Sequence, residues 1–546
     1  MSVFSVWIVA NFSVVRNCYF ESQIPTLNTM FARNAIDGAC LLDGSAALRR
    51  VAAYRVSHSV PAKDGATSET ETLPKPMEKE TSHDVIVIGG GPAGSTAATL
   101  LSRQNHRVLL LEREKFPREH VGESLLPFCY CLLQDLGVIE QLKKNFVRKP
   151  GVRFIDRDGN VSTTWCFDHV IQDETYLSFQ VIRGDFDQIL LKNAAKNGAE
   201  VREETRVIEA DISAGDSVTV TSLDSADRKS VHRARFLVDA SGRDAFVGTK
   251  HGWRKSREEL DRTAIWSHWG NVKLQGGLEE GLSVIIYMGL EQKGWIWVFP
   301  IGENRITAGF VAQNSYLRDQ QRELTQNGSK DWKHDLCMQE LLHSKFCREL
   351  LEGSKLLLPM LINGNYSYEV KNHYGSNYAM VGDARGFIDP IFSSGVFLSI
   401  KTSYLVSAAI HKQLTEGLNG SNAEMEAAYK QVTGAYNFVH RMIRLFYNPH
   451  AVTWAQAGAD GLAHKAHENA MAAGHYMLSG DFFENYEKFD GFFKVLEEPK
   501  QFHRYQKLVI DRKEFNHPTC HSRWEDVFKD MIERDAERNA AFAASL

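Results

Sequence analysis

The feature that most constrains the fold is a glycine-rich run over residues 89–94, which reads GGGPAG and fits the pattern G-x-G-x-x-G. A β-branched segment over residues 83–88 precedes this run and predicts a buried strand. A helix is expected over residues 95–103, and a second apolar strand over residues 107–111 leads to Glu112. Strand, glycines, helix, strand and acid in this order predict a Rossmann-like dinucleotide-binding unit.

The glycines have separate physical tasks. Gly89 permits a tight turn, Gly91 lets the backbone approach a pyrophosphate, and Gly94 lets the helix pack close to the strand. The positive end of the helix dipole favours phosphate, and the acid after the second strand is placed to accept hydrogen bonds from ribose hydroxyls. The residues expected to bind the cofactor in this unit are Gly89, Gly91, Pro92, Ala93, Gly94 and Glu112.

Two later segments read as strands that end in small polar turns: residues 235–247, RFLVDASGRDAFV, and residues 378–386, YAMVGDARG. Together with residues 180–201, which begin QVIRGDFDQ, they resemble fingerprints of the flavoprotein monooxygenase superfamily. The resemblance implies FAD, with Asp383 near the ribityl chain and pyrophosphate and Arg183 near the flavin. The sequence contains no second complete G-x-G-x-x-G, so a separate NAD(P)H-binding unit is not expected.

Four short segments carry a narrower resemblance. GFIDPIFSSGVF (residues 386–397) matches every fixed position of the motif F-x-x-P-x-x-S-x-G, and GWIWVFP (residues 294–300) is similar to W-x-W-x-I-P, with Phe299 in place of isoleucine. FPREHVGESLLP (residues 116–127) resembles an FAD-contacting segment of the same family. FVRKPGVRF (residues 146–154) contains Lys149 at the position where that family has its catalytic lysine. These are motifs of the flavin-dependent halogenases.

The resemblance implies an activity and the residues that perform it. FADH2 supplied by a separate NAD(P)H-dependent flavin reductase reacts with O2 to a C4a-hydroperoxide, which oxidises chloride or bromide to a hypohalous species that halogenates an electron-rich aromatic. Lys149 is expected to steer this oxidant, by a hydrogen bond or as a haloamine, with Ser393 orienting the amine. Backbone N–H groups of Ser394 and Gly395 are expected to bind the halide, in a turn with positive φ at Gly395.

The substrate is expected to be a phenol. Phe392 stands where the tryptophan-halogenating branch carries a glutamate, and a phenol activates its own ring when deprotonated. Asp481 and Glu484 are candidate bases for that phenol, and both a free and a carrier-tethered substrate remain open. The resemblance adds Arg113, Arg118, Ser124, Arg183, Asp383 and Val396 at the cofactor, and Trp295, Trp297 and Phe392 as residues that shield the flavin from substrate.

Two other functions remain open from the sequence. One is a flavoprotein hydroxylase or prenyl-chain reductase of the same superfamily, and the other is an FAD-binding protein without catalysis. Composition narrows the class further: the net charge of −5 and the lack of a basic stripe give no reason to expect nucleic acid. No apolar run approaches the roughly 20 residues of a membrane span, and the eight cysteines form no C-x-x-C pair, so no membrane anchor or metal is expected.

The expected fold class is α/β (α+β), in three regions. Residues 1–80 are interpreted as a disordered, targeting or non-native extension, because they contain few acidic residues up to Tyr54 and then resemble a linker. Met77 is an alternative start of the protein. The protein is expected in the cytoplasm, and targeting to an organelle by the extension remains open. The other two regions are a Rossmann-like FAD-binding domain over 81–415 (81–150, 176–260 and 370–415), interleaved with a substrate-facing antiparallel sheet (151–175 and 261–369), and a helical C-terminal region over 416–546 that covers the substrate pocket.

Overall fold

The computed structural model describes a single unit of the chain, within Pro74–Leu546. The expected N-terminal extension, residues 1–80, and the candidate base Glu484 lie outside the described residues. The described residues are 81–169, 171, 174–274, 281–289, 294–364, 366–417, 423–451, 453–457, 468–483 and 493.

A seven-stranded sheet forms around the glycine-rich run. Its central strands β1, β2, β7, β10 and β19 are parallel, whereas β9 and β8 continue the sheet from β10 in antiparallel pairing. Parallel central strands explain why the sequence reads as continuous apolar runs, because both faces are covered. The strands are β1 (Thr81–Ile88), β2 (Val108–Leu111), β7 (Glu200–Arg202), β8 (Arg206–Asp211), β9 (Val218–Leu223), β10 (Lys229–Asp239) and β19 (Tyr378–Met380).

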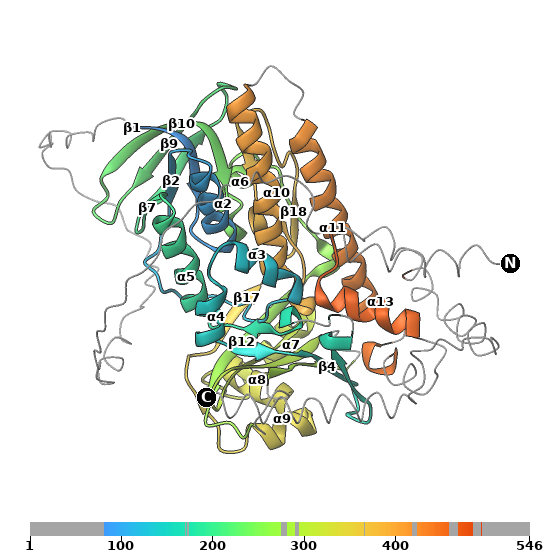
Figure 1. Cartoon of the computed structure of the whole chain (residues 1–546). Coiled ribbons are helices and arrows are strands. Elements are labelled where there is room, and N and C mark those ends of the chain that lie inside the picture. The colour runs from blue at the N-terminus through green and yellow to red at the C-terminus, as the bar shows by residue number, and fades with distance from the viewer. Residues whose placement is uncertain are drawn as a thin grey trace, which may run out of the picture. The chain divides into compact units, whose positions relative to one another are not determined.

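Three helices cover one face of this sheet. Val85 and Val87 of β1 pack in a cluster with residues of α2, α5 and α10, whereas Ile86 and Ile88 belong to the cluster on the opposite face. This alternation follows from the two-residue period of a strand. The helices are α2 (Pro92–Arg103), α5 (Arg183–Lys196) and α10 (Gly395–Glu416), and α11 (Ala423–Tyr447) runs beside α10 (Figure 1).

An eight-stranded sheet forms the second layer system. It is antiparallel except for one pair, because β13 and β4 are brought together by a long crossover and run in the same direction. The strands are β4 (Gly151–Ile155), β5 (Ser162–Cys166), β12 (Arg262–Gly270), β13 (Ser283–Tyr287), β14 (Trp295–Gly302), β15 (Arg305–Gln313), β16 (Lys355–Leu356) and β17 (Leu361–Gly364). The mixed architecture confirms the predicted fold class.

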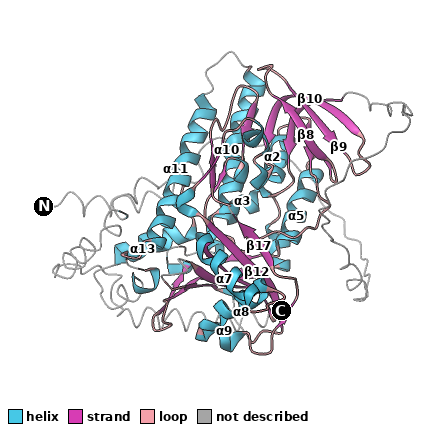
Figure 2. Ribbon diagram, turned by 180° about the vertical axis from the view of Figure 1, so that it is seen from behind, coloured by secondary structure: helices cyan, strands magenta, loops and turns pink. Residues whose placement is uncertain are grey.

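The two faces of β14 have different partners. Ile296 and Val298 pack against one layer of helices, α7 (Asn314–Gln326), α8 (Trp332–His343) and α9 (Lys345–Leu350), which lie below the sheet in both views (Figures 1 and 2). Trp295, Trp297 and Phe299 point to the other face and join the largest hydrophobic cluster. The tryptophans therefore face the half of the molecule that contains the 386–397 turn.

Shorter elements complete the described part of the chain. They are α3 (Tyr130–Asp135), α4 (Ile139–Asn145), α6 (Phe246–Lys250), α13 (Glu468–Ser479), the paired strands β3 (Val147–Lys149) and β6 (Ser178–Gln180), and the strands β11 (Arg254–Ser256), β18 (Tyr368–Val370) and β20 (Gly386–Phe387). Among the helices described, none combines the length and apolar character needed to cross a bilayer.

Candidate active site

The glycine-rich turn leaves a backbone cradle at the start of α2. Gly89 has φ +98°, which favours glycine, and a Cβ at Gly94 would lie 1.9 Å from the carbonyl oxygen of Gly89. Gly91 caps α2 without any side-chain hydrogen bond, and a Cβ there would meet only the Arg118 guanidinium, at 3.6 Å. Free N–H groups, open space and a nearby guanidinium fit a pyrophosphate.

Glu112 is held at the end of β2 beside this cradle. One carboxylate oxygen accepts from the Gly90 N–H at 2.6 Å, and the other accepts from the Glu114 N–H at 2.8 Å. The side chain is buried. Its position between the glycine turn and the second strand agrees with the expected place of a ribose-binding acid.

The arginines expected at the cofactor differ in their surroundings. Arg118 pairs with Asp187 at 3.0 Å and reaches the glycine turn. The half-exposed Arg113 is paired with Asp244. Sequence reasoning treated these two arginines alike because it did not anticipate their acidic partners.

Arg183 is buried and fixed by a carboxylate. Its guanidinium donates two hydrogen bonds to Asp187, both 2.9 Å long, and a third to the Val121 carbonyl at 2.7 Å. Burial raises the pKa of Asp383 to about 6, with Arg183 and Arg243 opposing the shift. A partly buried acid with arginines in electrostatic reach, in a turn that packs against Ala93 of α2, fits the ribityl–pyrophosphate part of FAD.

The turn over residues 386–397 ends in an open helix N-terminus. Ser393 has φ +54°, so the left-handed residue is Ser393 and not, as expected, Gly395. Ser394 is the N-cap of α10 and forms no side-chain capping bond, so the first N–H groups, including those of Gly395 and Val396, have no partner within the helix. A Cβ at Gly395 would meet a single atom within 4 Å, Cε2 of Phe387 at 4.0 Å. Space and unpaired donors therefore coincide at Gly395.

Lys149 is fully buried at the end of β3. Its Nζ is hydrogen-bonded to Oγ of Ser124 at 2.8 Å and donates to the carbonyl oxygen of Leu125 at 3.0 Å, and it lies 5.4 Å from the centre of the Phe167 ring. Burial without an acidic partner lowers the pKa of Lys149 to about 7. The hydroxyl on the amine is that of Ser124, which was expected at the cofactor, and not that of Ser393.

A polar network that the sequence did not reveal fixes one of the two tryptophans. Trp295 Nε1 donates to the Tyr447 hydroxyl at 2.9 Å, and this hydroxyl donates to Asp389 at 2.8 Å. Tyr366 donates to the same carboxylate oxygen at 3.2 Å. Burial raises the pKa of Asp389. Asp389, within the turn motif, was the only residue of this network that the sequence singled out near the turn. Tyr366 and Tyr447 lie outside the motif, so nothing in the sequence indicated their contacts with Asp389.

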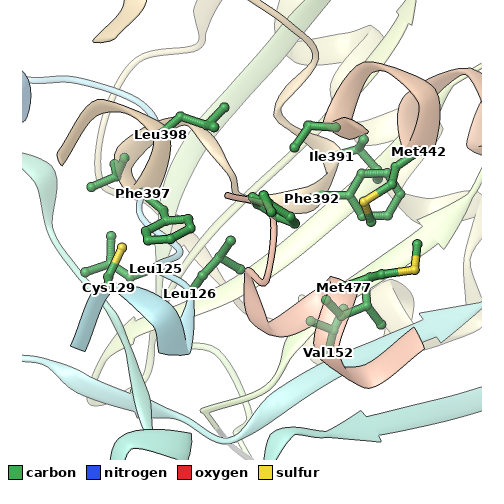
Figure 3. Close-up of a cluster of buried hydrophobic side chains, with 14 of the residues drawn as sticks. Leu125, Leu126, Cys129, Val152, Ile391, Phe392, Phe397, Leu398, Met442 and Met477 are labelled. Atoms are coloured by element: carbon green, nitrogen blue, oxygen red, sulfur yellow. The ribbon is translucent and has the colours of Figure 1, made fainter. Parts of the chain in front are cut away.

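One apolar cluster contains residues beside the lysine and residues of the turn (Figure 3). Leu125 and Cys129 lie beside the Lys149 amine, and Phe392 and Phe397 come from the turn and the start of α10. Figure 3 shows Leu126 between these two groups and further members of the cluster, Val152, Met442 and Met477, around Phe392. The cluster is apolar and contains several aromatic rings.

Asp481 follows α13 and lies close to this cluster. A Cβ added to the preceding residue, Gly480, would lie 3.2 Å from Cβ of Phe128 and 3.4 Å from Cβ of Leu126. Asp481 itself is buried. The structure thus brings one candidate base close to the cluster. Within the described residues, no group of three or more His, Cys, Asp or Glu side chains is arranged to hold a metal ion.

Comparison with known proteins gives a family model and named relatives. Residues 82–421 match the family model described as FAD binding domain. The chain is 30% identical over 390 residues to the flavin-dependent halogenase armH1 of Armillaria mellea, covering 67% of this chain and 74% of the relative. It is 31% identical over 349 residues to the 1H-pyrrole-2-carbonyl-[peptidyl-carrier protein] chlorinase of Pseudomonas fluorescens, covering 60% and 75%.

A solved structure shares both sequence and fold. The crystal structure of CmlS, a flavin-dependent halogenase, is 29% identical with a TM-score of 0.60, and the match covers 67% of this chain and 64% of that chain.

Proposed function

Because this chain belongs to the flavin-dependent halogenases, we propose that it uses reduced FAD, O2 and chloride or bromide to halogenate an electron-rich aromatic ring, in particular a phenol. The observation that carries the proposal is the arrangement of two polar sites on one apolar cluster. The buried amine of Lys149 is bonded to the backbone of Leu125, a member of this cluster. The open N-terminus of α10 contributes Val396 and Phe397 to the same cluster. An oxidant formed at one site and used at the other would be shielded from water.

FAD fits the residues that surround the α2 cradle. The free N–H groups at Gly91 and the Arg118 guanidinium would bind its pyrophosphate, and Glu112 would bind its ribose. When bound and reduced by a separate NAD(P)H-dependent flavin reductase, FAD supplies two electrons to O2. The halide supplies the other two, so that one O2, one FADH2, one halide, one aromatic C–H and one proton give the aryl halide, FAD and two waters.

The start of α10 is suited to bind the halide. The N–H groups of Ser394 and Gly395 are the proposed donors, and the helix dipole adds partial positive charge at this position. The space in front of Gly395 leaves room for an anion. Trp295 and Trp297, held on β14, are proposed to keep the aromatic substrate away from the flavin.

Lys149 is proposed to position the oxidised halogen next to the substrate. Its amine is buried and has one further N–H besides its contacts with Ser124 and Leu125. Loss of this group should remove an interaction made in the transition state and leave FAD binding intact.

A phenol is proposed because Phe392 contributes only apolar surface where an acid would be needed to help an indole ring. Phe392 is buried against Phe446 and Trp454, with ring centres 6.2 and 5.9 Å away. The Pseudomonas relative is named for a pyrrole on a carrier protein, so both free and carrier-bound phenols belong in the test.

The test is a product assay. The purified chain is incubated with FAD, a flavin reductase, NADH, bromide and a panel of phenols, and the products are read by mass spectrometry, where bromine gives an isotope doublet. Lys149→Ala should yield no brominated product, while the exposed neighbour Lys144→Ala should behave as the unmodified chain. Oxygenated phenol in place of brominated phenol, or rapid flavin reduction by NADPH without the reductase, would overturn the proposal.

A further inference from the structure

Three polar side chains connect the Lys149 amine to the eight-stranded sheet. Nζ of Lys149 lies 2.8 Å from Oγ of Ser124, which lies 3.0 Å from Oγ of Ser283 on β13. Nε2 of Gln180 lies 2.8 Å from the same Ser283 oxygen. All four side chains are at most 4% exposed, so their hydrogen bonds are made with one another and not with bulk water.

The backbone fixes the positions of these groups. The Leu125 N–H donates to the Phe179 carbonyl at 2.9 Å, and the Val181 N–H donates to the Glu123 carbonyl at 2.7 Å, so residues 123–125 run alongside β6. On the other side of β6, Ser178 is the cross-strand partner of Lys149. Ser124, Gln180 and Lys149 therefore come from three adjacent extended segments.

The Gln180 amide sets the donor-to-acceptor direction of this chain of hydrogen bonds, which runs from Gln180 through Ser283 and Ser124 to Lys149. Its Nε2 also lies 3.1 Å from the carbonyl oxygen of Gly281, which can only accept, so the NH2 group faces both partners and donates to Ser283. Ser283 has a single proton to donate, and the Ser124 oxygen at 3.0 Å is the polar neighbour left to receive it, so the proton is assigned to that bond. The Ser124 proton is then directed at Nζ of Lys149.

A neutral amine completes this chain, whereas an ammonium conflicts with it. The lone pair of a neutral amine accepts from Ser124, and one N–H donates to the Leu125 carbonyl. An ammonium would have to donate to Ser124, which leaves one serine proton without an acceptor in a buried site, an unfavourable arrangement. In both forms the remaining position on the nitrogen carries an N–H and not the lone pair.

We infer that Gln180, Ser283 and Ser124 are positioning residues that hold the Lys149 amine neutral, with its lone pair on Ser124 and one N–H left for the oxidant. The inference rests on the role of Lys149 given under Proposed function. It selects between the two modes that the sequence left open: Lys149 engages the hypohalous acid as a hydrogen-bond donor, because its lone pair is not available for a nitrogen–halogen bond.

The charged and titratable groups around the amine support a neutral form. The Cys129 thiol faces it and stays protonated, since burial raises its pKa to about 12. Arg148 bonds to the Leu177 carbonyl, and the Glu123 carboxylate bonds to the Gly122 N–H. Among the described residues, no carboxylate is thus paired with Lys149, and the lowering of its pKa to about 7 by burial agrees with the direction of these hydrogen bonds.

The test is the protonation state of Lys149 in the full chain, measured by NMR with 13C,15N-labelled lysine. The Lys149 signal is assigned by its loss in Lys149→Met. In the unmodified chain, we expect the amine to be neutral at pH 8.5. Gln180→Glu puts an acceptor at the far end and lets the chain run in reverse, so it should raise the Lys149 pKa by at least one unit, a tenfold change.

A double variant separates the effect of the hydrogen-bond chain on the Lys149 pKa from the effect of the added negative charge. Gln180→Glu with Ser283→Ala keeps the carboxylate but breaks the connection, so most of the pKa rise should disappear. Ser178→Ala, a buried serine beside Lys149 outside the chain, should leave the pKa unchanged. A charged Lys149 at pH 8.5 in the unmodified protein would overturn the inference, and this measurement does not depend on the folding of any variant. An equal rise of the Lys149 pKa in the single and double variants would overturn it as well. Neither outcome depends on product formation, so a failure of the halogenase proposal is seen separately in the phenol assay.

Discussion

Gly395→Ala should separate stability from halide use. At this position the backbone is not in the left-handed region, and an added Cβ would lie 4.0 Å from Cε2 of Phe387, an ordinary van der Waals distance. Alanine is a better helix former than glycine by up to about 1 kcal/mol, so the variant should fold at least as well as the unmodified chain.

The halide should nevertheless bind more weakly. The methyl group occupies the space in front of the first N–H groups of α10, where the anion is proposed to sit. Loss of one hydrogen bond to a charged acceptor costs about 1.5–3 kcal/mol, which corresponds to about 10- to 150-fold weaker binding. Gly395→Val, with two more methyl groups, should remove the halide response altogether.

The assay is stopped-flow absorbance of the reduced, FAD-loaded protein mixed with O2 at rising bromide concentrations, alongside thermal unfolding. Gly302→Ala is the control, because a Cβ there also meets its nearest neighbour, Arg305, at an ordinary 3.8 Å, but far from the helix start in the sequence. A bromide response in Gly395→Ala equal to that of the unmodified chain would refute the reasoning and leave the turn as a structural corner.

Three further predictions follow from named contacts. Tyr447→Phe leaves the Trp295 N–H without its partner and removes one of the two hydrogen bonds to Oδ2 of Asp389, whereas Tyr366→Phe removes only the other of these two bonds. Denaturant unfolding should therefore show Tyr447→Phe as less stable than Tyr366→Phe by about 1–3 kcal/mol, and only Tyr447→Phe should release more hydrogen peroxide. Because burial lowers the Lys149 pKa from 10.5 to about 7, the unfolded chain binds the extra proton between these values, so stability should rise with pH through that window, and Lys149→Met should flatten the rise. Gly94→Ala should abolish FAD binding, seen by loss of flavin absorbance on gel filtration, because its Cβ would lie 1.9 Å from a carbonyl oxygen.

The parts of the site that sequence predicted well depend on local backbone chemistry. Gly89 and Gly94 have the conformation and the close approach that a G-x-G-x-x-G turn demands, and both follow from residues adjacent in the chain. The turn motif indicated backbone donors at Ser394 and Gly395, but the helix that begins at Gly395 was not predicted. Positive φ was predicted for Gly395, but Ser393 has that conformation. Glycine adopts positive φ most readily, but other residues adopt it as well.

The parts that sequence missed depend on contacts across long separations. Tyr447 reaches Asp389 from 58 positions away and Trp295 from 152, and Ser283 meets Ser124 across 159. No local period or spacing encodes such a pair. These contacts exist only once the FAD-binding sheet and the eight-stranded sheet are packed, so serine and tyrosine at these positions read as ordinary strand and helix residues.

Two buried cations show how the same burial produces opposite chemistry. Burial alone would lower the pKa of Arg183, but Asp187 holds it on two sides and raises the pKa, so the guanidinium stays a fixed positive charge beside the cofactor site. Lys149 is equally buried, but its neighbours are Ser124 and a carbonyl, so nothing compensates desolvation and the pKa falls to about 7. A carboxylate beside Lys149 would turn it into a second fixed charge. Because its partner is the uncharged Ser124 hydroxyl, the amine can lose its proton near neutral pH and be held in the neutral form.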